Sequence, residues 1–225
     1  MRHPDRAVTP PPPPPAPASR QDRPVIPAAA RVLSAEALAA HLEQGGAALF
    51  PTDTVPALAA RPERAGQLWS LKHRPQRKPL ILMGADLHQL VDALGGSWAG
   101  PWLEQAGRCW PGAFTLVLPI TGALPAALHP AGTGLGLRVP DCPMARDLLR
   151  RSGPLATTSA NLSGEPPALT AGEAAERFPG LPLLGPLPWP GGSGTASTVI
   201  SWEPGDSWRI LRRGTGLPPP GDAAG

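Results

Sequence analysis

The sequence predicts a single α/β domain over residues 28–216, preceded by a proline-rich tail. Apolar segments typical of strands alternate with amphipathic helical segments through that range, which is the pattern of a sheet covered by helices. The 34 prolines are unevenly spread, since ten of them fall within residues 1–27. We therefore expect residues 1–27 to be disordered, residues 28–216 to fold, and residues 217–225 to form a second, Pro/Gly-rich tail.

Helix signals and apolar runs alternate along the first half of the domain. Ser34 can cap a helix that Gly45 ends. Asp86 opens a later helix, whose apolar residues at 87, 90, 91 and 94 have helical spacing. The expected elements, in order, are a helix over 34–44, a strand over 47–51, a helix over 63–72, a strand over 79–83, a helix over 86–94, a helix over 102–109 and a strand over 113–119.

The same alternation continues in the second half. Pro204 and Gly205 form a turn between two closing strands. The expected elements are a strand over 135–140, a helix over 143–151, a strand over 154–161, a helix over 171–178, and strands over 197–202 and 207–212. No internal repeat interrupts this order, so one domain is the simplest interpretation.

The unbroken proline run from Pro10 to Pro15 admits two interpretations. It is either a polyproline II ligand for an aromatic groove, which would make the tail an adaptor, or an extension without a function of its own. A tail of this composition has too few apolar residues to add to the core of the domain.

Charge is nearly balanced over the predicted domain. The formal net charge of the chain is +3, and residues 1–27 supply two of those three charges. A near-neutral body argues against broad, sequence-independent binding of polyanions, although it leaves room for a small basic pocket. No apolar stretch reaches the roughly 18 residues of a membrane span, and no apolar signal segment opens the chain. We therefore expect a cytoplasmic protein with no membrane partner.

Several motifs that would define a reaction class are absent from the sequence. It contains no GxxxxGK[ST], no GxGxxG that follows a strand, no HExxH, no paired CxxC and no GxSxG, which argues against P-loop, dinucleotide-binding, zinc and serine-hydrolase chemistry. Cys109 and Cys142 have no further thiol or histidine at metal spacing. We expect two reduced thiols rather than a disulfide or a nucleophile, and no metal held by the protein.

Four polar clusters follow predicted strands or lie in loops, where α/β sheets bind ligands. They are Thr52–Thr54, the basic segment 72–78, the segment 157–161, and the segment 193–198 together with Arg212 and Arg213. The basic segment is the most informative, because its five basic side chains have no acid among them. Helix capping would account for Lys72 and Arg74 but not for Arg77 and Lys78. A phosphate-binding role accounts for all of them.

Taken in order, these segments resemble the YrdC/Sua5 family of threonylcarbamoyl-AMP synthases. The matching segments are PTDTV (51–55), KHRPQRKPL (72–80), WPGAFTLVLP (110–119), GLRVPD (136–141), TSANLSGEPP (158–167), ASTVI (196–200) and ILRRG (210–214). The resemblance covers about residues 31–216 and implies the short form of the family, without the C-terminal Sua5 domain. It also implies a twisted, open, mixed sheet flanked by helices around a concave, basic cavity.

The resemblance implies an L-threonylcarbamoyladenylate synthase, a nucleotidyltransferase that uses ATP with Mg²⁺, bicarbonate and L-threonine. Its product serves N6-threonylcarbamoyladenosine formation at position 37 of tRNA, so tRNA, other double-stranded RNA and the downstream threonylcarbamoyl transferase machinery are implied partners. The catalytic residues would be Lys72 and Arg74. The nucleotide-binding residues would be Lys72, Arg74, Lys78, Ser159, Asn161 and Arg212. The L-threonine site would comprise Thr54, Arg138, Thr157 and Ser197.

Two departures from the family pattern favour a second hypothesis. The family continues PTDTV with Tyr-Gly-Leu, where this chain has Pro56, Ala57 and Leu58, and it places an aspartate where this chain has Ser201. The alternative is a divergent module of the same fold that binds RNA or a nucleotide without turnover. The intact basic pair and the Ser159–Asn161 pair favour the enzyme.

Overall fold

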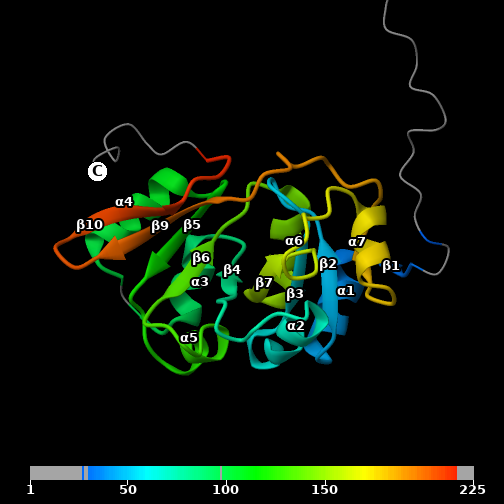
Figure 1. The fold of residues 1–225 in the computed structure, drawn as a ribbon, viewed down its shortest axis with the longest axis horizontal. Coiled ribbons are helices and arrows are strands. Elements are labelled where there is room, and N and C mark those ends of the chain that lie inside the picture. The colour runs from blue at the N-terminus through cyan, green and yellow to red at the C-terminus, as the bar shows by residue number, and fades with distance from the viewer. Residues whose placement is uncertain (1–26, 28–29, 97, 217–225) are drawn as a thin grey trace, which may run out of the picture.

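The fold is built on one open sheet that runs through the whole molecule (Figure 1). The computed structural model describes residues 27, 30–96 and 98–216, so the predicted tails, apart from Pro27, lie outside the described residues. The strands are β1 (Val32–Leu33), β2 (Ala47–Phe50), β3 (Ala57–Ala60), β4 (Ile81–Met83), β5 (Phe114–Leu118), β6 (Leu135–Arg138), β7 (Leu155–Ser159), β8 (Leu183–Leu184), β9 (Thr198–Glu203) and β10 (Ser207–Arg212).

The sheet is mixed, as expected. Its order is β1-β8-β2-β3-β7-β4-β6-β5-β9-β10. β4 pairs with β6 and β5 with β9 in parallel, whereas β7 is antiparallel to both β3 and β4. The central strands therefore come from distant parts of the chain, and this brings the sequence clusters together.

Helices cover the sheet, and none within the described residues is both long and apolar enough to cross a membrane. They are α1 (Ala35–Glu43), the 3₁₀ turn η2 (Pro62–Arg64), α2 (Gly66–Leu71), α3 (Leu87–Ala93), α4 (Gly100–Cys109), α5 (Ala123–Leu128), α6 (Pro143–Ser152) and α7 (Ala171–Arg177). In Figure 1, α4 lies beside the β9–β10 hairpin at one end of the sheet, and α1, α7 and β1 lie at the other.

Strand alternation divides the core between the two faces of the sheet. Phe50 packs in one cluster with apolar residues of α1 and α6, while its neighbour Leu49 packs in another with Leu68 and Trp69 of α2. Successive side chains of a strand point to opposite faces, so β2 is apolar throughout because both of its faces are covered.

Local signals predicted the helix starts well. Ser34 caps α1 by accepting a hydrogen bond from the Ala37 amide at 3.2 Å. Asp86 caps α3 through the Gln89 amide at 2.9 Å. The helix expected over 63–72 is instead divided into η2 and α2, because no side chain caps either segment and Pro62 opens the first of them.

Four elements were not predicted, and β3 matters most. Its sequence Ala-Leu-Ala-Ala has helical rather than strand propensity, yet it pairs with β2 and β7 and is fully buried. Pairing on both edges outweighs the propensity. β1 and β8 are only two residues long and show no period, and α5 contains Pro125, a residue disfavoured inside helices.

Candidate functional site

A cavity of about 340 Å³ opens on the middle of the sheet. Its floor includes a row across four strands in which Thr157 of β7 pairs with Ile81 of β4, Ile81 with Gly136 of β6, and Gly136 with Val117 of β5. The remaining lining comprises Thr52, Thr54, Val55, Pro56, Ala57, Arg74, Pro79, Met83, Thr115, His129, Gly134, Arg138, Thr158, Ser159, Ala196, Ser197, Val199, Leu211 and Arg212. We call this the central cavity. Three of its lining residues are arginines, and no carboxylate is among them.

The strand register gives the central cavity two ends. Gly136 lies in the middle of the cavity floor. Arg138 is two residues after Gly136 on β6 and pairs with Met83, and Gly134 is two residues before Gly136. We call the part of the cavity at Arg138 the Arg138 end. We call the opposite part the Arg74 end, because Arg74 donates to the carbonyl of Pro79 at 3.0 Å, and Pro79 precedes Ile81 by two residues as Gly134 precedes Gly136. Four residues of strand separate the ends by about 13 Å.

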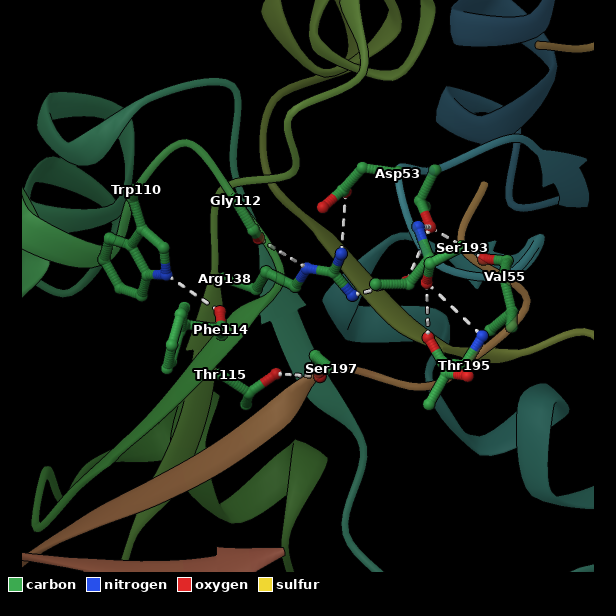
Figure 2. A network of polar contacts seen from close by, with 12 residues as sticks. Asp53, Val55, Trp110, Gly112, Phe114, Thr115, Arg138, Ser193, Thr195 and Ser197 are labelled. Carbon is green, nitrogen blue, oxygen red and sulfur yellow. Dashed lines mark hydrogen bonds and ion pairs between the residues drawn. The ribbon is translucent and has the colours of Figure 1, made fainter. Parts of the chain in front are cut away.

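Arg138 is 4 % exposed and already has three partners. It donates from Nη2 to Asp53 Oδ1 at 2.7 Å, from Nη1 to Thr54 Oγ1 at 2.9 Å, and from Nε to the Gly112 carbonyl at 3.2 Å. Figure 2 shows its guanidinium held between Asp53 and Gly112. Burial lowers the pKa of Arg138 and the charge of Asp53 opposes that shift. A guanidinium has five N–H donors, so two of them are left for a ligand.

The turn that carries Asp53 is held rigidly. Thr52 Oγ1 lies 3.0 Å from Thr54 Oγ1 and donates to the Val55 carbonyl at 2.7 Å. The loop around Ser193, which contains Gly191, Gly192 and Gly194, lies against this turn, because the Ser193 amide donates to the Asp53 carbonyl at 3.0 Å. Short polar side chains thus close the turn on themselves, and the turn positions Asp53 for Arg138.

The start of β9 completes the Arg138 end. Ser197 Oγ lies 2.8 Å from Thr115 Oγ1 of β5 (Figure 2). Arg212 of β10 donates from Nη2 to the Ser197 carbonyl at 2.8 Å, and partial burial lowers its pKa. The hydroxyls of Thr115 and Ser197 and a second guanidinium therefore line the same cavity as Arg138.

Two polar atoms in the central cavity lack partners. Within the described residues, Arg74 Nε at the Arg74 end and Thr157 Oγ1 in the middle row of the floor are buried and make no hydrogen bond. Both residues line the central cavity. Burial lowers the pKa of Arg74. A buried donor or hydroxyl without a partner costs about 1–3 kcal/mol, so these atoms mark positions where a ligand would supply the missing bonds.

Lys72 lies behind the cavity rather than in its lining. It is 1 % exposed, and its Nζ donates to the carbonyls of Ser159 and Asn161, both at 2.5 Å, and to Asn161 Oδ1 at 3.1 Å. Three bonds use all three protons of the ammonium. Burial, and then the charge of Arg74, lower the pKa of Lys72 to about 7. Lys72 thus holds the loop after β7 from behind.

Comparisons with known proteins decide the family. The Sua5_yciO_yrdC family model, described as "Telomere recombination", matches residues 40–214. The chain belongs to this family. Threonylcarbamoyl-AMP synthase of Bacillus subtilis (strain 168) is 38 % identical over 195 residues, which is 80 % of this chain and 52 % of that protein. The enzyme of the same name from Pseudomonas paraeruginosa is 35 % identical over 60 % of this chain and 75 % of its own length.

Solved structures of the Sua5/YciO/YrdC family share this fold. P. abyssi Sua5 in complex with L-threonine aligns with a TM-score of 0.72 and 30 % identity, over 80 % of this chain and 54 % of that one. E. coli YciO aligns with a TM-score of 0.69 and 21 % identity, over 83 % and 95 %. The chain thus spans about half the length of the Bacillus subtilis and P. abyssi proteins. These matches confirm the predicted family and its open mixed sheet.

The structure gathers most of the site residues that the resemblance implied. The residues that line the central cavity are Thr54, Arg74, Arg138, Thr157, Ser159, Ser197 and Arg212. Asn161 lies just outside, where its Oδ1 accepts from Ser159 Oγ at 2.5 Å. Lys78 is exposed and does not line the cavity. The roles of these residues stay predictions, as does a net positive potential in the cavity.

Sequence reasoning missed Thr115 and His129 as site residues. It placed Asp53 in the polar cluster Thr52–Thr54 after a strand but assigned it no role in the site. Thr115 is the polar residue of an apolar strand, and strand alternation could have placed it on the Val117 face. Nothing local singles out His129.

The cysteines and the described acids give no sign of a metal centre. Cys109 and Cys142 are buried thiols that no disulfide joins, as expected, and burial raises the pKa of Cys142. Among the described residues, no group of three His, Cys, Asp or Glu is placed to hold a metal ion.

Proposed function

We propose that this protein is an L-threonylcarbamoyladenylate synthase, which forms threonylcarbamoyl-AMP and pyrophosphate from ATP, bicarbonate and L-threonine for N6-threonylcarbamoyladenosine formation in tRNA. The names of its relatives support this. The observation that carries the proposal is the pair of unpartnered buried atoms, Arg74 Nε and Thr157 Oγ1, in one cavity with arginines at both ends.

L-Threonine would bind at the Arg138 end. Its carboxylate would accept the two N–H groups that Arg138 keeps after its three intramolecular bonds. The hydroxyls of Thr54, Thr157 and Ser197 would surround the amine and side-chain hydroxyl. Those of Thr54 and Ser197 already have protein partners, whereas that of Thr157 has none within the described residues and would bond the ligand directly. Since P. abyssi Sua5 was solved with L-threonine, the related fold has room for this substrate.

The nucleotide would bind toward the Arg74 end, with its phosphates at Arg74 and Ser159. Arg74 Nε would gain a phosphate oxygen as acceptor, and Lys72 would keep Ser159 and Asn161 in position. Arg212 would contact the nucleotide from across the cavity. Mg²⁺ would arrive with ATP, with phosphates and water supplying most of its ligands.

The reaction needs positioning and charge neutralisation more than a strong base. The amine of threonine attacks the carbon of bicarbonate, a C–N bond forms, and a C–O bond breaks with loss of water, which gives an N-carboxylate. One of its oxygens attacks the α-phosphorus, an O–P bond forms, and the bond to the bridging oxygen breaks with its electron pair leaving on pyrophosphate. Arg74 is a fixed cation where negative charge builds up on the departing phosphates, and holding both substrates in one cavity supplies the entropic advantage.

Pyrophosphate release tests the proposal. Purified protein with ATP and bicarbonate should release pyrophosphate with L-threonine well above the level with L-serine or without amino acid. Equal release in all three reactions would contradict the threonine assignment. Tight, salt-dependent binding of tRNA without ATP consumption would instead support the module that lacks turnover.

A further inference from the structure

One corner of the central cavity is lined mainly by glycine and apolar side chains. Gly136 of β6 lies there beside Val117, and Gly134, just before β6, Ile81 and Leu211 also belong to the lining. A Cβ at Gly136 would lie 2.8 Å from Ile81 Cγ2, and one at Gly134 would lie 2.9 Å from the Leu118 carbonyl oxygen and 3.4 Å from Val117 Cγ1. The two glycines add no side chain of their own to the cavity, and the side chains of Ile81, Val117 and Leu211 in its lining are apolar, which suits an aromatic ring.

His129, at the end of α5, is the polar member of this corner. Its Nδ1 lies 2.8 Å from the carbonyl oxygen of Gly134. A carbonyl only accepts hydrogen bonds, so Nδ1 carries the proton and donates it. In the neutral imidazole Nε2 is then an acceptor, and within the described residues it makes no hydrogen bond.

The orientation of the imidazole is fixed before any ligand arrives. Gly132 lies directly against the ring, because a Cβ there would come within 2.2 Å of Nε2 and nearer still to Cε1 and Nδ1. The Gly134 carbonyl also blocks the other tautomer, since a lone pair on Nδ1 would face a carbonyl oxygen. His129 therefore offers an acceptor and cannot become a donor while it is neutral.

We propose that His129 is the residue that selects the purine base of the nucleotide, with its Nε2 accepting a hydrogen bond from the 6-amino group of adenine. A 6-oxo purine would present an oxygen acceptor to the same lone pair. The inference rests on the proposed function, since it takes ATP as the substrate. To the proposed function it adds that the cavity prefers adenine over a 6-oxo purine and that His129 is the residue responsible.

The geometry of the cavity supports a base in this position. The apolar corner lies on the β5 and β6 side, whereas Ser159 and Arg74 lie toward β7 and β4. Neighbouring strands are about 4.8 Å apart, so a nucleotide with its phosphates at Arg74 can reach the corner with its base. A ring there would lie in the part of the cavity that Leu211 and the two glycines line.

The test compares ATP with inosine triphosphate, which differs at the 6-position. At pH 8, titration calorimetry with L-threonine present should show wild-type protein binding ATP about tenfold more tightly than inosine triphosphate, as expected for one hydrogen bond gained against one acceptor clash. Pyrophosphate release should show the same preference in kcat/KM. Equal affinity for the two nucleotides would overturn the inference.

Two variants assign the preference to His129. His129→Phe keeps a ring without an acceptor, and His129→Leu removes the ring, so at least one should fold; both should bring the affinity ratio close to one. Arg74→Lys is the matched control, since it should weaken both nucleotides and leave their ratio unchanged. A preference that survives in a folded His129 variant would overturn the inference. If no nucleotide binds to wild-type protein, the proposed function fails and this inference with it.

Discussion

The arginines at the two ends of the central cavity differ in how many of their side-chain donors are hydrogen-bonded. Arg138 is bonded to Asp53, Thr54 and Gly112 before any ligand arrives. Among the described residues, the Arg74 side chain donates only to the Pro79 carbonyl, and its buried Nε has no partner. The Arg138 end is thus preorganised by the protein, whereas the Arg74 end has a donor that only a ligand would satisfy.

This difference follows from where each arginine lies in the fold. Arg138 is on a central strand and meets a rigid turn, so neighbouring elements can satisfy it. Arg74 follows α2 in a loop whose next residues are exposed. Preorganised donors are already oriented for a ligand, whereas a donor without a partner gains most from one. We therefore expect substitutions at the Arg74 end to affect activity and those at the Arg138 end to affect stability as well.

The largest effect is expected for Arg74→Ala. Loss of a cation where phosphate charge develops should lower kcat/KM by roughly 100-fold or more, while the free energy of unfolding changes by less than about 0.5 kcal/mol. Steady-state pyrophosphate release and urea unfolding measure the two. Arg77→Ala, an exposed neighbour in the same segment, is the control and should stay within about twofold of wild type. Lost stability with preserved activity would make Arg74 a helix-capping residue.

Lys72→Met should lower both activity and stability, because it leaves the carbonyls of Ser159 and Asn161 and Asn161 Oδ1 without their donor. We expect the KM for ATP to rise about tenfold and the free energy of unfolding to fall by about 2 kcal/mol. An unchanged free energy of unfolding would show that Lys72 does not hold this loop.

The pH dependence of stability gives Lys72 a second readout. Its pKa is about 7 in the folded protein and near 10.5 in an unfolded chain. Between these values the unfolded state binds more protons, so wild-type stability should rise with pH from about 7 upward relative to Lys72→Met. A flat difference would show that the three oxygen acceptors keep the ammonium charged through this range.

Asp53→Asn tests the organised end. It keeps an oxygen near Arg138 but removes the charge that orients the guanidinium, so the KM for L-threonine should rise several-fold while the KM for ATP stays unchanged. The free energy of unfolding should fall by about 1–2 kcal/mol. Asp141→Asn, at an exposed carboxylate, is the matched control. A lower KM for threonine would mean that Asp53 competes with the substrate.

Thr157→Val should have the smallest effect on the fold. Its hydroxyl has no partner, so an isosteric methyl should leave the free energy of unfolding unchanged or raise it by less than about 1 kcal/mol. Activity with L-threonine should still fall several-fold, since the ligand loses that hydroxyl. Thr115→Val, which removes a hydroxyl already bonded to Ser197, should instead cost stability. Equal stability losses would remove the distinction between these hydroxyls.

Sequence reasoning reached the family and most of the cavity, for physical reasons that differ by residue. Ser34 and Asp86 signalled helix starts because capping is local. Thr54 and Thr157 stood in separate polar clusters, and only the resemblance added Arg138 and joined the three in one site, since β2, β6 and β7 are far apart in the chain. The row that joins Thr157, Ile81, Gly136 and Val117 depends on sheet order, which no local pattern contains.

The partners of a side chain were the least predictable feature. The sequence predicts that the five basic residues of segment 72–78 bind a phosphate. In the structure, however, the Lys72 ammonium donates to the carbonyls of Ser159 and Asn161, and Lys78 is exposed. Asp53 was not seen as the partner of Arg138, because 85 residues separate them. Side-chain pairing across such distances depends on the packed structure.

A crystal structure with a non-hydrolysable ATP analogue and L-threonine tests the contrast between the two ends most directly. The account predicts that Arg74 Nε and Thr157 Oγ1 each gain a ligand acceptor or donor, while the Asp53–Arg138 ion pair keeps its place and the threonine carboxylate meets the remaining Arg138 donors. Both ligands bound with Arg74 Nε still unpartnered, or with the Asp53–Arg138 pair broken, would contradict it.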